Sequence, residues 1–289
     1  MKKVTERLLV FFIGVPAVVG IVLFLPFCNH LPLNIVVILF SAAGAVEFSS
    51  MLEKKQMHIS KIKAFIFGAL APLALALTIN FNFPEWIIPL LVMAAISWAL
   101  LPIAFSGLTQ IEAAAGRIAA GFSALIYPGF FMYWLIKMTT WENAGVIILI
   151  FLLIPLCSDA AAWLAGSLFG KNNRGIIPAS PNKSIAGFIG GVVGSVIISG
   201  GAALIVPSVF VTCTENVPRI LMVIILGIGT GIAATLGDLV ESAIKRSCDT
   251  KDSGNLMLGR GGILDSIDSI AVSAPVFFLL YSVLFVNSQ

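Results

Sequence analysis

An uncharged run gives way to a charged one in LMVIILGIGTGIAATLGDLVESAIKRSCDTKDSGNLMLGRGGILDSIDS, residues 221–269. No side chain from Leu221 to Thr235 is charged, and the run that follows, Ile270 to Val286, is also uncharged. The charged side chains between these runs are Asp238, Glu241, Lys245, Arg246, Asp249, Lys251, Asp252, Arg260, Asp265 and Asp268. Charges at the edge of lipid are costly to keep there. The stretch therefore indicates a functional site at a membrane surface.

The rest of the chain is apolar enough to set the fold class. Of its 289 residues, 59% are hydrophobic and 11% are charged. A helix needs about 20 apolar residues to span a bilayer, and lipid favours helices because their backbone groups are paired internally. Such runs lie at 8–27, 32–52, 62–80, 86–105, 117–137, 144–166, 185–206, 219–241 and 269–286. We predict an all-α, polytopic membrane helix bundle of about nine transmembrane helices.

The chain is expected to form one integral membrane domain over residues 1–289. Residues 1–140 supply the N-terminal spans, and residues 141–289 hold further spans and the cytoplasmic loops that carry the candidate site. With a cytoplasmic N-terminus, all of the 17 Lys and Arg residues except Lys137 and Arg219 fall on the cytoplasmic side. This bias predicts a multi-pass protein of the cell membrane whose site is cytoplasmic and whose C-terminus is outside.

The charged stretch has the composition of a site for metal and phosphate. Side chains spaced by three and four residues share one helical face, and here these are Asp238, Glu241, Ser242 and Lys245. Asp265 and Asp268 likewise share a face where the next helix begins, and a helix N-terminus favours carboxylates. Carboxylates hold divalent cations, and Lys and Arg hold phosphates. We expect the intervening turn to bring Asp238 and Asp265 together around a cation.

Other polar and small residues have simpler interpretations. Glu47 is an intramembrane carboxylate that we expect to snorkel or to be bonded within the bundle. The four cysteines include no CxxC pair, so neither a zinc site nor a redox motif is indicated. Gly187, Gly190, Gly191 and Gly194 form a small-residue face for close helix packing. Basic residues are not interleaved with aromatic ones, so no nucleic acid is expected as a partner.

The order of residues in the charged stretch resembles the C-terminal signature of the phosphatidate cytidylyltransferase (CDP-diacylglycerol synthase) family. The matching residues are Ser242, Lys245-Arg246, Lys251-Asp252, Gly259-Arg260-Gly261-Gly262, Asp265 and Asp268. A second block is also similar: Ser158-Asp159, Trp163, Gly166, Phe169-Gly170-Lys171, Ser180-Pro181-Asn182-Lys183-Ser184, Gly187 and Gly190-Gly191. The chain departs from the family pattern at Arg260, where His is usual, and at Ser266, where Arg is usual.

The resemblance implies transfer of a cytidylyl group from CTP to phosphatidic acid, with Mg²⁺, alone or together with a second cation, as cofactor. It implies Asp238 and Asp265 as the principal metal carboxylates, and Asp268 as a further ligand or a partner of one. Lys245 would act on the reacting phosphates. The implied substrate-binding residues are Arg246, Lys251, Asp252, Arg260, Ser242, Asp159, Lys171, Ser180 and Lys183. The lipid bilayer is an implied partner, and a homodimer is a further expectation.

Two other functions fit parts of the pattern. An ion-coupled secondary transporter would use Glu47, Asp159 and Asp238 as relays, but such proteins place charges near the bilayer midplane rather than at helix ends. A CDP-alcohol phosphatidyltransferase is also a metal-dependent membrane enzyme, but its D-G-x-x-A-R pattern is absent from the sequence.

Overall fold

The apolar runs form long helices. The structure, a computed structural model, describes residues 10–105, 107, 113–212, 217–257, 259 and 261–286, without the side chains of Val10, Phe11 and Pro102. In chain order the helices are η1 (Val10–Gly14), α2 (Val15–Phe24), α3 (Phe27–Glu53), α4 (Lys61–Phe81), α5 (Ile87–Ala104), α7 (Ala114–Ala124), η2 (Leu125–Phe130), α8 (Phe131–Met138), α9 (Ala144–Phe169), α10 (Ile185–Ile205), η3 (Pro207–Val209), α11 (Arg219–Ser247) and α12 (Leu264–Phe285).

Seven helical segments in the described residues are long and apolar enough to cross a membrane. They are Phe27–Glu53, Lys61–Phe81, Ala114–Met138, Ala144–Phe169, Ile185–Ile205, Arg219–Ser247 and Leu264–Phe285. The other two predicted spans, 8–27 and 86–105, coincide with shorter apolar helices, Phe12–Phe24 and Ile87–Leu101. The protein is an all-α membrane helix bundle, and the predicted count of nine spans is approximate.

The chain forms two compact units. Unit 1 takes Met1–Thr140 and Lys245–Ile267, and unit 2 takes Trp141–Ile244 and Asp268–Gln289. The end of α11, the loop after it and the first residues of α12 therefore belong to unit 1. The remainder of these two helices belongs to unit 2.

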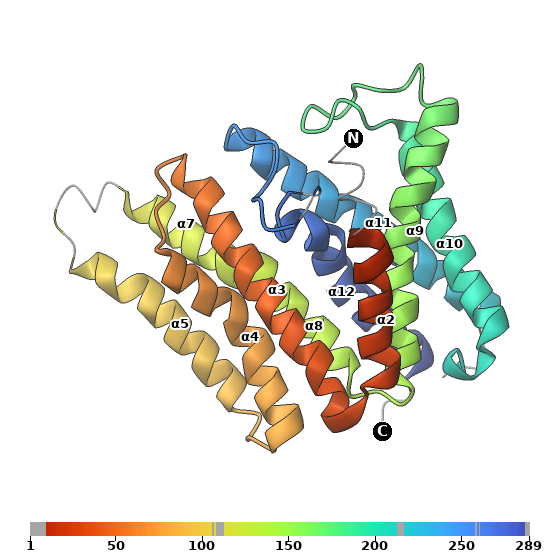
Figure 1. The fold of residues 1–289 in the computed structure, drawn as a ribbon, viewed down its shortest axis with the longest axis horizontal. Coiled ribbons are helices and arrows are strands. Elements are labelled where there is room, and N and C mark those ends of the chain that lie inside the picture. The colour runs from red at the N-terminus through yellow and green to blue at the C-terminus, as the bar shows by residue number, and fades with distance from the viewer. Residues whose placement is uncertain are drawn as a thin grey trace. The chain divides into compact units, whose positions relative to one another are not determined.

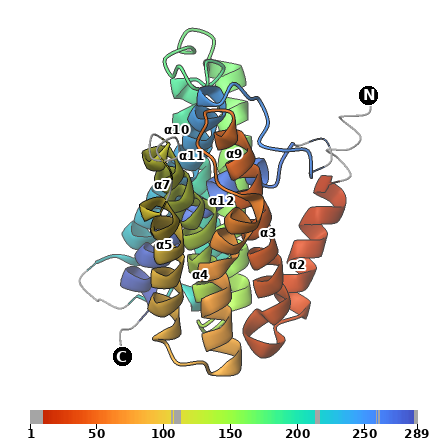
Figure 2. The same cartoon turned by 90° about the vertical axis from the view of Figure 1, so that its left-hand side faces the viewer.

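Within unit 1, α4 lies between α3 and α5 (Figures 1 and 2). Small residues allow α3 and α4 to approach closely, since a Cβ on Gly68 would lie 2.6 Å from Ala45 Cβ. The Ser41 hydroxyl donates across this contact to the carbonyl oxygen of Gly68 at 2.6 Å. In a membrane such polar links between helices need close backbone contact. The tight contact with α4 fixes the position of α3, which contributes a residue to the site described below.

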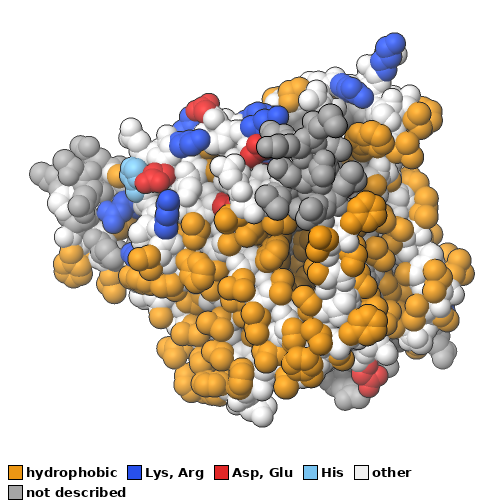
Figure 3. Space-filling view, in the orientation of Figure 1, with side chains coloured by type: hydrophobic (Ala, Val, Ile, Leu, Met, Phe, Trp, Pro, Cys, Tyr) orange, Lys and Arg blue, Asp and Glu red, His pale blue; other side chains and the backbone are white. Residues whose placement is uncertain are grey.

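The outer surface of unit 1 suits lipid along most of its length. Exposed hydrophobic side chains on α3, α4 and α5 include Leu39, Ile62, Leu73, Met93 and Leu101. In Figure 3 such side chains cover these helices, whereas charged side chains gather near the end of α3. A lipid-facing flank with charges at one helix end is the arrangement expected for a spanning bundle.

Unit 2 is also built on close helix contacts. A Cβ on Gly194 of α10 would lie 2.6 Å from Ala161 Cβ of α9, and one on Gly187 would lie 2.9 Å from the Ala162 carbonyl oxygen. The two helices lie side by side in Figure 1, with the loop of residues 170–184 beyond their ends. The predicted packing role of the α10 glycines is confirmed. On α12, Phe277 and Tyr281 stack with ring centroids 5.5 Å apart.

Candidate active site

In unit 1, Asp265 is the centre of a polar cluster in the first turn of α12. Its Oδ1 accepts a hydrogen bond from Lys245 Nζ at 2.6 Å. Its Oδ2 accepts from the backbone N–H groups of Ser253 at 2.9 Å and Gly262 at 2.7 Å. The side chains of Lys245 and Asp265 are only 15% and 8% exposed. The loop between α11 and α12 therefore folds back on Asp265, a predicted site residue.

The glycines of this loop have a structural reason. Gly261 has φ +104°, a conformation that favours glycine, and a Cβ there would lie 2.6 Å from Asp265 Oδ2. The backbone of Gly261 also exchanges hydrogen bonds with Met257, at 2.9 and 3.1 Å. These glycines bring the loop backbone close to the Asp265 carboxylate. We call Lys245, Ser253, Gly262 and Asp265 the Asp265 cluster.

In unit 2, Asp238 on α11 forms a second pair. Its Oδ2 accepts a hydrogen bond from Lys183 Nζ at 2.5 Å, and Ser242 Oγ lies 3.4 Å from its Oδ1. The side chains of Lys183 and Asp238 are 29% and 31% exposed. Lys183 comes from the loop before α10, far from Asp238 in sequence. We call Lys183, Asp238 and Ser242 the Asp238 cluster.

Close packing of α11 on α12 supports Asp238. A Cβ on the preceding residue, Gly237, would lie 2.5 Å from the carbonyl oxygen of Asp268. Asp268 is itself buried, and its Oδ1 accepts the backbone N–H of Ser269 at 2.5 Å. The two helices therefore cross at Gly237, which precedes Asp238, and at Asp268. Asp238 and Asp268 are both predicted site carboxylates.

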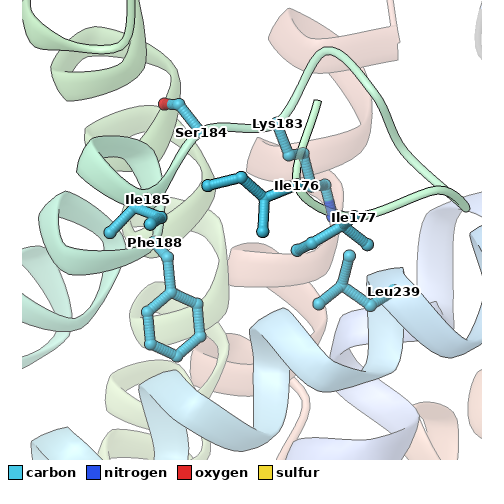
Figure 4. A pocket seen from close by; sticks show the side chains of 7 residues that line it. All are labelled: Ile176, Ile177, Lys183, Ser184, Ile185, Phe188 and Leu239. Atoms are coloured by element: carbon cyan, nitrogen blue, oxygen red, sulfur yellow. The ribbon is translucent and has the colours of Figure 1, made fainter. Parts of the chain in front are cut away.

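An apolar pocket of about 180 Å³ adjoins the Asp238 cluster. Its lining residues are Ile176, Ile177, Lys183, Ser184, Ile185, Phe188 and Leu239. In Figure 4, Ile176, Ile177 and Leu239 converge on one side of the pocket, whereas the Ser184 hydroxyl points away from it. That hydroxyl instead caps α10 by accepting the N–H of Gly187 at 3.0 Å. The pocket places an apolar surface beside a lysine and a carboxylate.

The other predicted site residues lie outside these two clusters. Arg246, Lys251 and Asp252 are exposed on the unit 1 part of the stretch, and Asp159 and Lys171 are exposed in unit 2. Ser180 is partly exposed in the loop before α10. Arg260 lies outside the residues that the structure describes. The exposed basic side chains are accessible to an anionic ligand from solvent.

The carboxylates have the donor chemistry of a divalent-cation site. Oxygen ligands suit Mg²⁺, and Asp238 and Asp265 each already attract a cationic ammonium group. Among the described residues, however, no three His, Cys, Asp or Glu side chains are gathered as metal ligands. The carboxylates therefore fit a cation by chemistry, and the ligand set stays a prediction.

One contact to the Asp265 cluster was not predicted. Glu47 of α3 is 6% exposed, and its Oε2 accepts from Ser253 Oγ at 3.1 Å and from the Leu264 backbone N–H at 2.9 Å. Of the two roles expected for Glu47, bonding within the bundle is the one observed. Its position as a lone carboxylate in an apolar run was the only signal in the sequence.

Comparison with known proteins assigns the family. The sequence model of the cytidylyltransferase family matches residues 5–284. The chain belongs to the cytidylyltransferase family. It is 28% identical over 282 residues to the phosphatidate cytidylyltransferase of Bacillus subtilis (strain 168), covering 97% of this chain and 98% of the relative. It is 30% identical over 267 residues to the phosphatidate cytidylyltransferase of Staphylococcus saprophyticus, covering 91% and 96%.

Membership of the family makes the protein a cytidylyltransferase, an enzyme that transfers a cytidylyl group. The family match extends through both units, so neither cluster lies outside the shared region. The resemblance noted in the charged stretch is thereby confirmed over nearly the whole chain.

Proposed function

We propose that this cytidylyltransferase uses CTP and phosphatidic acid to make CDP-diacylglycerol and diphosphate. The observation that carries the proposal is the similarity, over nearly the full length of each chain, to relatives named phosphatidate cytidylyltransferase. The proposal is also supported by a bundle of apolar helices, which lets diacyl tails stay in lipid while a nucleotide arrives from water. The two lysine–carboxylate pairs supply charges suited to phosphate chemistry.

The reaction is a displacement at phosphorus. An oxygen of the lipid phosphate forms a bond to the α-phosphorus of CTP, and the bond from that phosphorus to the bridging oxygen of the β-phosphate breaks. Diphosphate leaves with the electron pair of the broken bond. A phosphate monoester is already anionic, so the protein needs no strong base to activate it. Its tasks are to orient the two substrates and to neutralise their charges.

Lysines of the two clusters are the proposed phosphate-binding groups. Lys245 is held by Asp265 and Lys183 by Asp238, which fixes where each ammonium lies before substrate arrives. Further contacts are proposed for the remaining substrate-binding residues: Arg246, Lys251 and Arg260 toward phosphates, Asp159, Lys171 and Ser180 toward nucleotide or lipid, and Asp252 and Ser242 toward substrate. The exposed Arg246 and Lys251 are suited to first capture of an anion from solvent.

Mg²⁺ is the proposed cofactor, and Asp238, Asp265 and Asp268 are its proposed ligands. When bound, such a cation would neutralise phosphate charge and so favour displacement at phosphorus. Asp268 is buried, and the Ser269 N–H that its Oδ1 accepts would help to orient its carboxylate toward the cation. We also propose a second cation at the site, a homodimer, and an orientation with a cytoplasmic site and the C-terminus outside.

The decisive experiment uses purified protein in detergent or vesicles with radiolabelled CTP, phosphatidic acid and Mg²⁺. Label should enter the lipid phase as CDP-diacylglycerol, and omission of either phosphatidic acid or Mg²⁺ should prevent this. A protein that incorporates no label, yet moves ions or solutes across sealed vesicles, would support the transporter instead. Lipid product formed only from preformed CDP-diacylglycerol and an alcohol would indicate a phosphatidyltransferase.

A further inference from the structure

One face of α3 contacts the loop that carries the charged signature. Gly44, Glu47 and Met51 recur at helical spacing and so share a face. A Cβ on Gly44 would lie 3.3 Å from Ile267 Cδ1, and Met51 Sδ lies 3.7 Å from Thr250 Oγ1. Lys55, just beyond the helix, pairs with Asp249 at 2.7 Å. All these residues belong to unit 1. The loop therefore rests on α3 from its first residues to the start of α12.

Glu47 is the polar centre of this contact. Its carboxylate is buried, and Oε2 accepts two hydrogen bonds, from the Ser253 hydroxyl and from the Leu264 backbone N–H. Leu264 is the first residue of α12. The first N–H groups of a helix have no partner within that helix. A side chain of α3 thus caps the helix whose first turn holds Asp265.

A single hydroxyl links Glu47 to Asp265. Ser253 Oγ lies 3.1 Å from Glu47 Oε2 and 2.9 Å from Asp265 Oδ2, and it also accepts the Asp265 backbone N–H at 3.3 Å. Displacement of Glu47 would therefore disturb Ser253 and Asp265 together. The hydrogen bonds of Glu47 go to Ser253 and Leu264, neither of which is proposed to bind substrate.

Two glycines make room for the carboxylate. A Cβ on Gly254 would overlap Glu47 Oε1 and lie 2.6 Å from Glu47 Cδ and 3.0 Å from Cγ. A Cβ on Gly262 would overlap Glu47 Oε2 and Ser253 Oγ, and would lie 2.7 Å from the Gly254 nitrogen. All three atoms nearest to the Gly254 site belong to Glu47, whereas the Gly262 site is also closed by the loop itself. This difference permits a sharp test.

We propose that Glu47 is a positioning residue for the cytidylyl transfer. As a buried acceptor on α3, it holds Ser253 and the first turn of α12, and through them it keeps Asp265 and its partner Lys245 in place. The proposal rests on the proposed function only in one respect, namely the identity of the reaction for which Asp265 and Lys245 are positioned. The anchoring of the loop by Glu47 does not depend on which substrates are used.

The first test compares three variants on α3. Glu47→Ala should lower kcat on the order of 10–10²-fold, because small displacements of reacting groups cost that much. Glu47→Gln, which keeps an acceptor oxygen, should recover most of this loss. Ser49→Ala is the matched control, since Ser49 is also buried but its hydroxyl donates to the Val46 carbonyl of its own helix, at 2.8 Å. It should leave kcat unchanged.

The second test separates positioning from general stability. Ser41→Ala removes a buried hydroxyl that links α3 to α4 without touching the loop. It should lower the Tm, but the kcat of the protein that remains folded should stay that of the wild type. Glu47→Ala should lower kcat even at temperatures where it is fully folded. If kcat fell in both variants in proportion to the fall in Tm, and by no more than that in Glu47→Ala, the proposal would be overturned.

The third test uses the glycines. Gly254→Ala should lower kcat about as much as Glu47→Ala, because both displace the carboxylate. Added to Glu47→Ala, it should do little more, since the atoms it would meet are gone. Gly262→Ala should remain damaging in both backgrounds because Ser253 and the Gly254 backbone still obstruct it. Equal effects of Gly254→Ala with and without Glu47 would contradict the proposal.

Hydrogen exchange at the Ser253 and Leu264 amides measures how firmly Glu47 anchors the loop, and it requires no substrate. Exchange should be at least about 10-fold faster in Glu47→Ala than in Ser49→Ala. Glu47 accepts the Leu264 N–H directly, and through the Ser253 hydroxyl it holds the loop in which the Ser253 N–H donates to Asp265. A wild-type protein that forms no CDP-diacylglycerol would refute the proposed function, yet exchange would still decide on Glu47. Unchanged exchange in Glu47→Ala, or faster exchange with an unchanged kcat, would overturn the positioning role.

Discussion

The two lysine–carboxylate pairs differ in how far they are removed from solvent. The pair in the Asp265 cluster is 15% and 8% exposed, and the pair in the Asp238 cluster is 29% and 31% exposed. Removing one partner of a buried pair leaves an uncompensated charge, and this is costly. Substitutions within the Asp265 cluster must therefore be checked for folding as well as for activity. The Asp238 cluster, being more open, is the better place to separate catalysis from stability.

The metal proposal makes the sharpest prediction at single residues. Asp238→Asn and Asp265→Asn keep the side-chain shape but remove the charge, so each should lower CDP-diacylglycerol formation on the order of 10²–10³-fold. The double variant should be little worse than either single one, because both carboxylates would act through the same metal. Rates measured against Mg²⁺ concentration, with expression and membrane insertion as controls, test this. Near-full, Mg²⁺-dependent activity in either variant would exclude that carboxylate as a ligand.

Lys245 is predicted to matter more than lysines elsewhere on unit 1. Lys245→Ala should lower activity more strongly than Lys54→Ala or Lys61→Ala, because it removes the partly buried ammonium beside Asp265. Lys54 and Lys61 are exposed and lie outside the cluster. Steady-state kinetics with varied CTP and varied phosphatidic acid would measure the difference. Equal losses in all three variants would show that general surface charge, rather than a site, is responsible.

Asp249 provides a control and a pH prediction. The hydrogen bond and charge of Lys55 lower the pKa of Asp249 below its ordinary value, and Asp249 raises the pKa of Lys55. The stability from the Asp249 side is present above its unfolded pKa and is lost as pH falls through the lowered folded pKa. From the Lys55 side it is present below the unfolded pKa and is lost as pH rises through the raised one. Because both side chains are exposed to solvent, the contribution is small and screened by salt.

Asp249→Asn should accordingly leave activity near the wild-type value. Asp249 has φ +52° after the end of α11, a conformation that Asn tolerates well. The N–H of Thr250 bonds the Lys245 carbonyl and that of Asp249 bonds the Arg246 carbonyl, which is a Schellman end. Thermal unfolding at neutral pH and low salt should show that the variant is only slightly less stable than the wild type. This difference should disappear at high salt or acid pH, where the Asp249–Lys55 pair of the wild type no longer contributes. A large loss of activity would place Asp249 in the site.

At the scale of single helices, α10 is divided into a packed and an open part. Toward its start, Gly187 and Gly194 contact α9 closely, whereas a Cβ on Gly200 or Gly201 would meet nothing within 4 Å. Glycine in a helix costs about 1 kcal/mol relative to alanine. The early glycines therefore offset this cost through close packing, and the late ones do not within the described residues.

This contrast predicts opposite outcomes for one substitution. Gly194→Ala should lower stability by about 1–3 kcal/mol, because its Cβ would be forced against Ala161. Gly200→Ala should leave the Tm unchanged or raise it slightly. Thermal unfolding of both variants in the same detergent makes the comparison. A destabilised Gly200→Ala would point to a contact outside the described residues, and a tolerated Gly194→Ala would mean that α9 and α10 can separate at no cost.

At the scale of the whole molecule, the basic residues predict that the loop after α11 lies on the cytoplasmic side. A cysteine at Asn255 is suited to this, because Asn255 is exposed whereas its neighbour Gly254 packs on Glu47. The variant should be made in a chain whose four native cysteines are replaced by Ser, so that only the introduced thiol can react. An impermeant thiol reagent should label Asn255→Cys only from the cytoplasmic side. Labelling from outside in intact cells would overturn both the span count and the cytoplasmic site.

The sequence by itself determined the fold class of the protein and the family to which it belongs. Long uncharged runs in lipid have to form helices, because only a helix pairs all its backbone groups within one segment. The order of charges from Asp238 to Asp268 identified the family before any fold was considered. The expected packing role of the α10 glycines also followed from spacing alone, since residues three and four apart share a helical face.

The tertiary structure decided which of these residues meet. Lys183 pairs with Asp238 across 55 residues, and Glu47 bonds Ser253 across 206. Spacing along one helix cannot specify such contacts, because they depend on where separate helices pack. For the same reason the sequence could mark Glu47 as unusual but not assign it to the loop that holds Asp265. Only the packing of α3 against that loop buries its carboxylate beside the two donors that it needs.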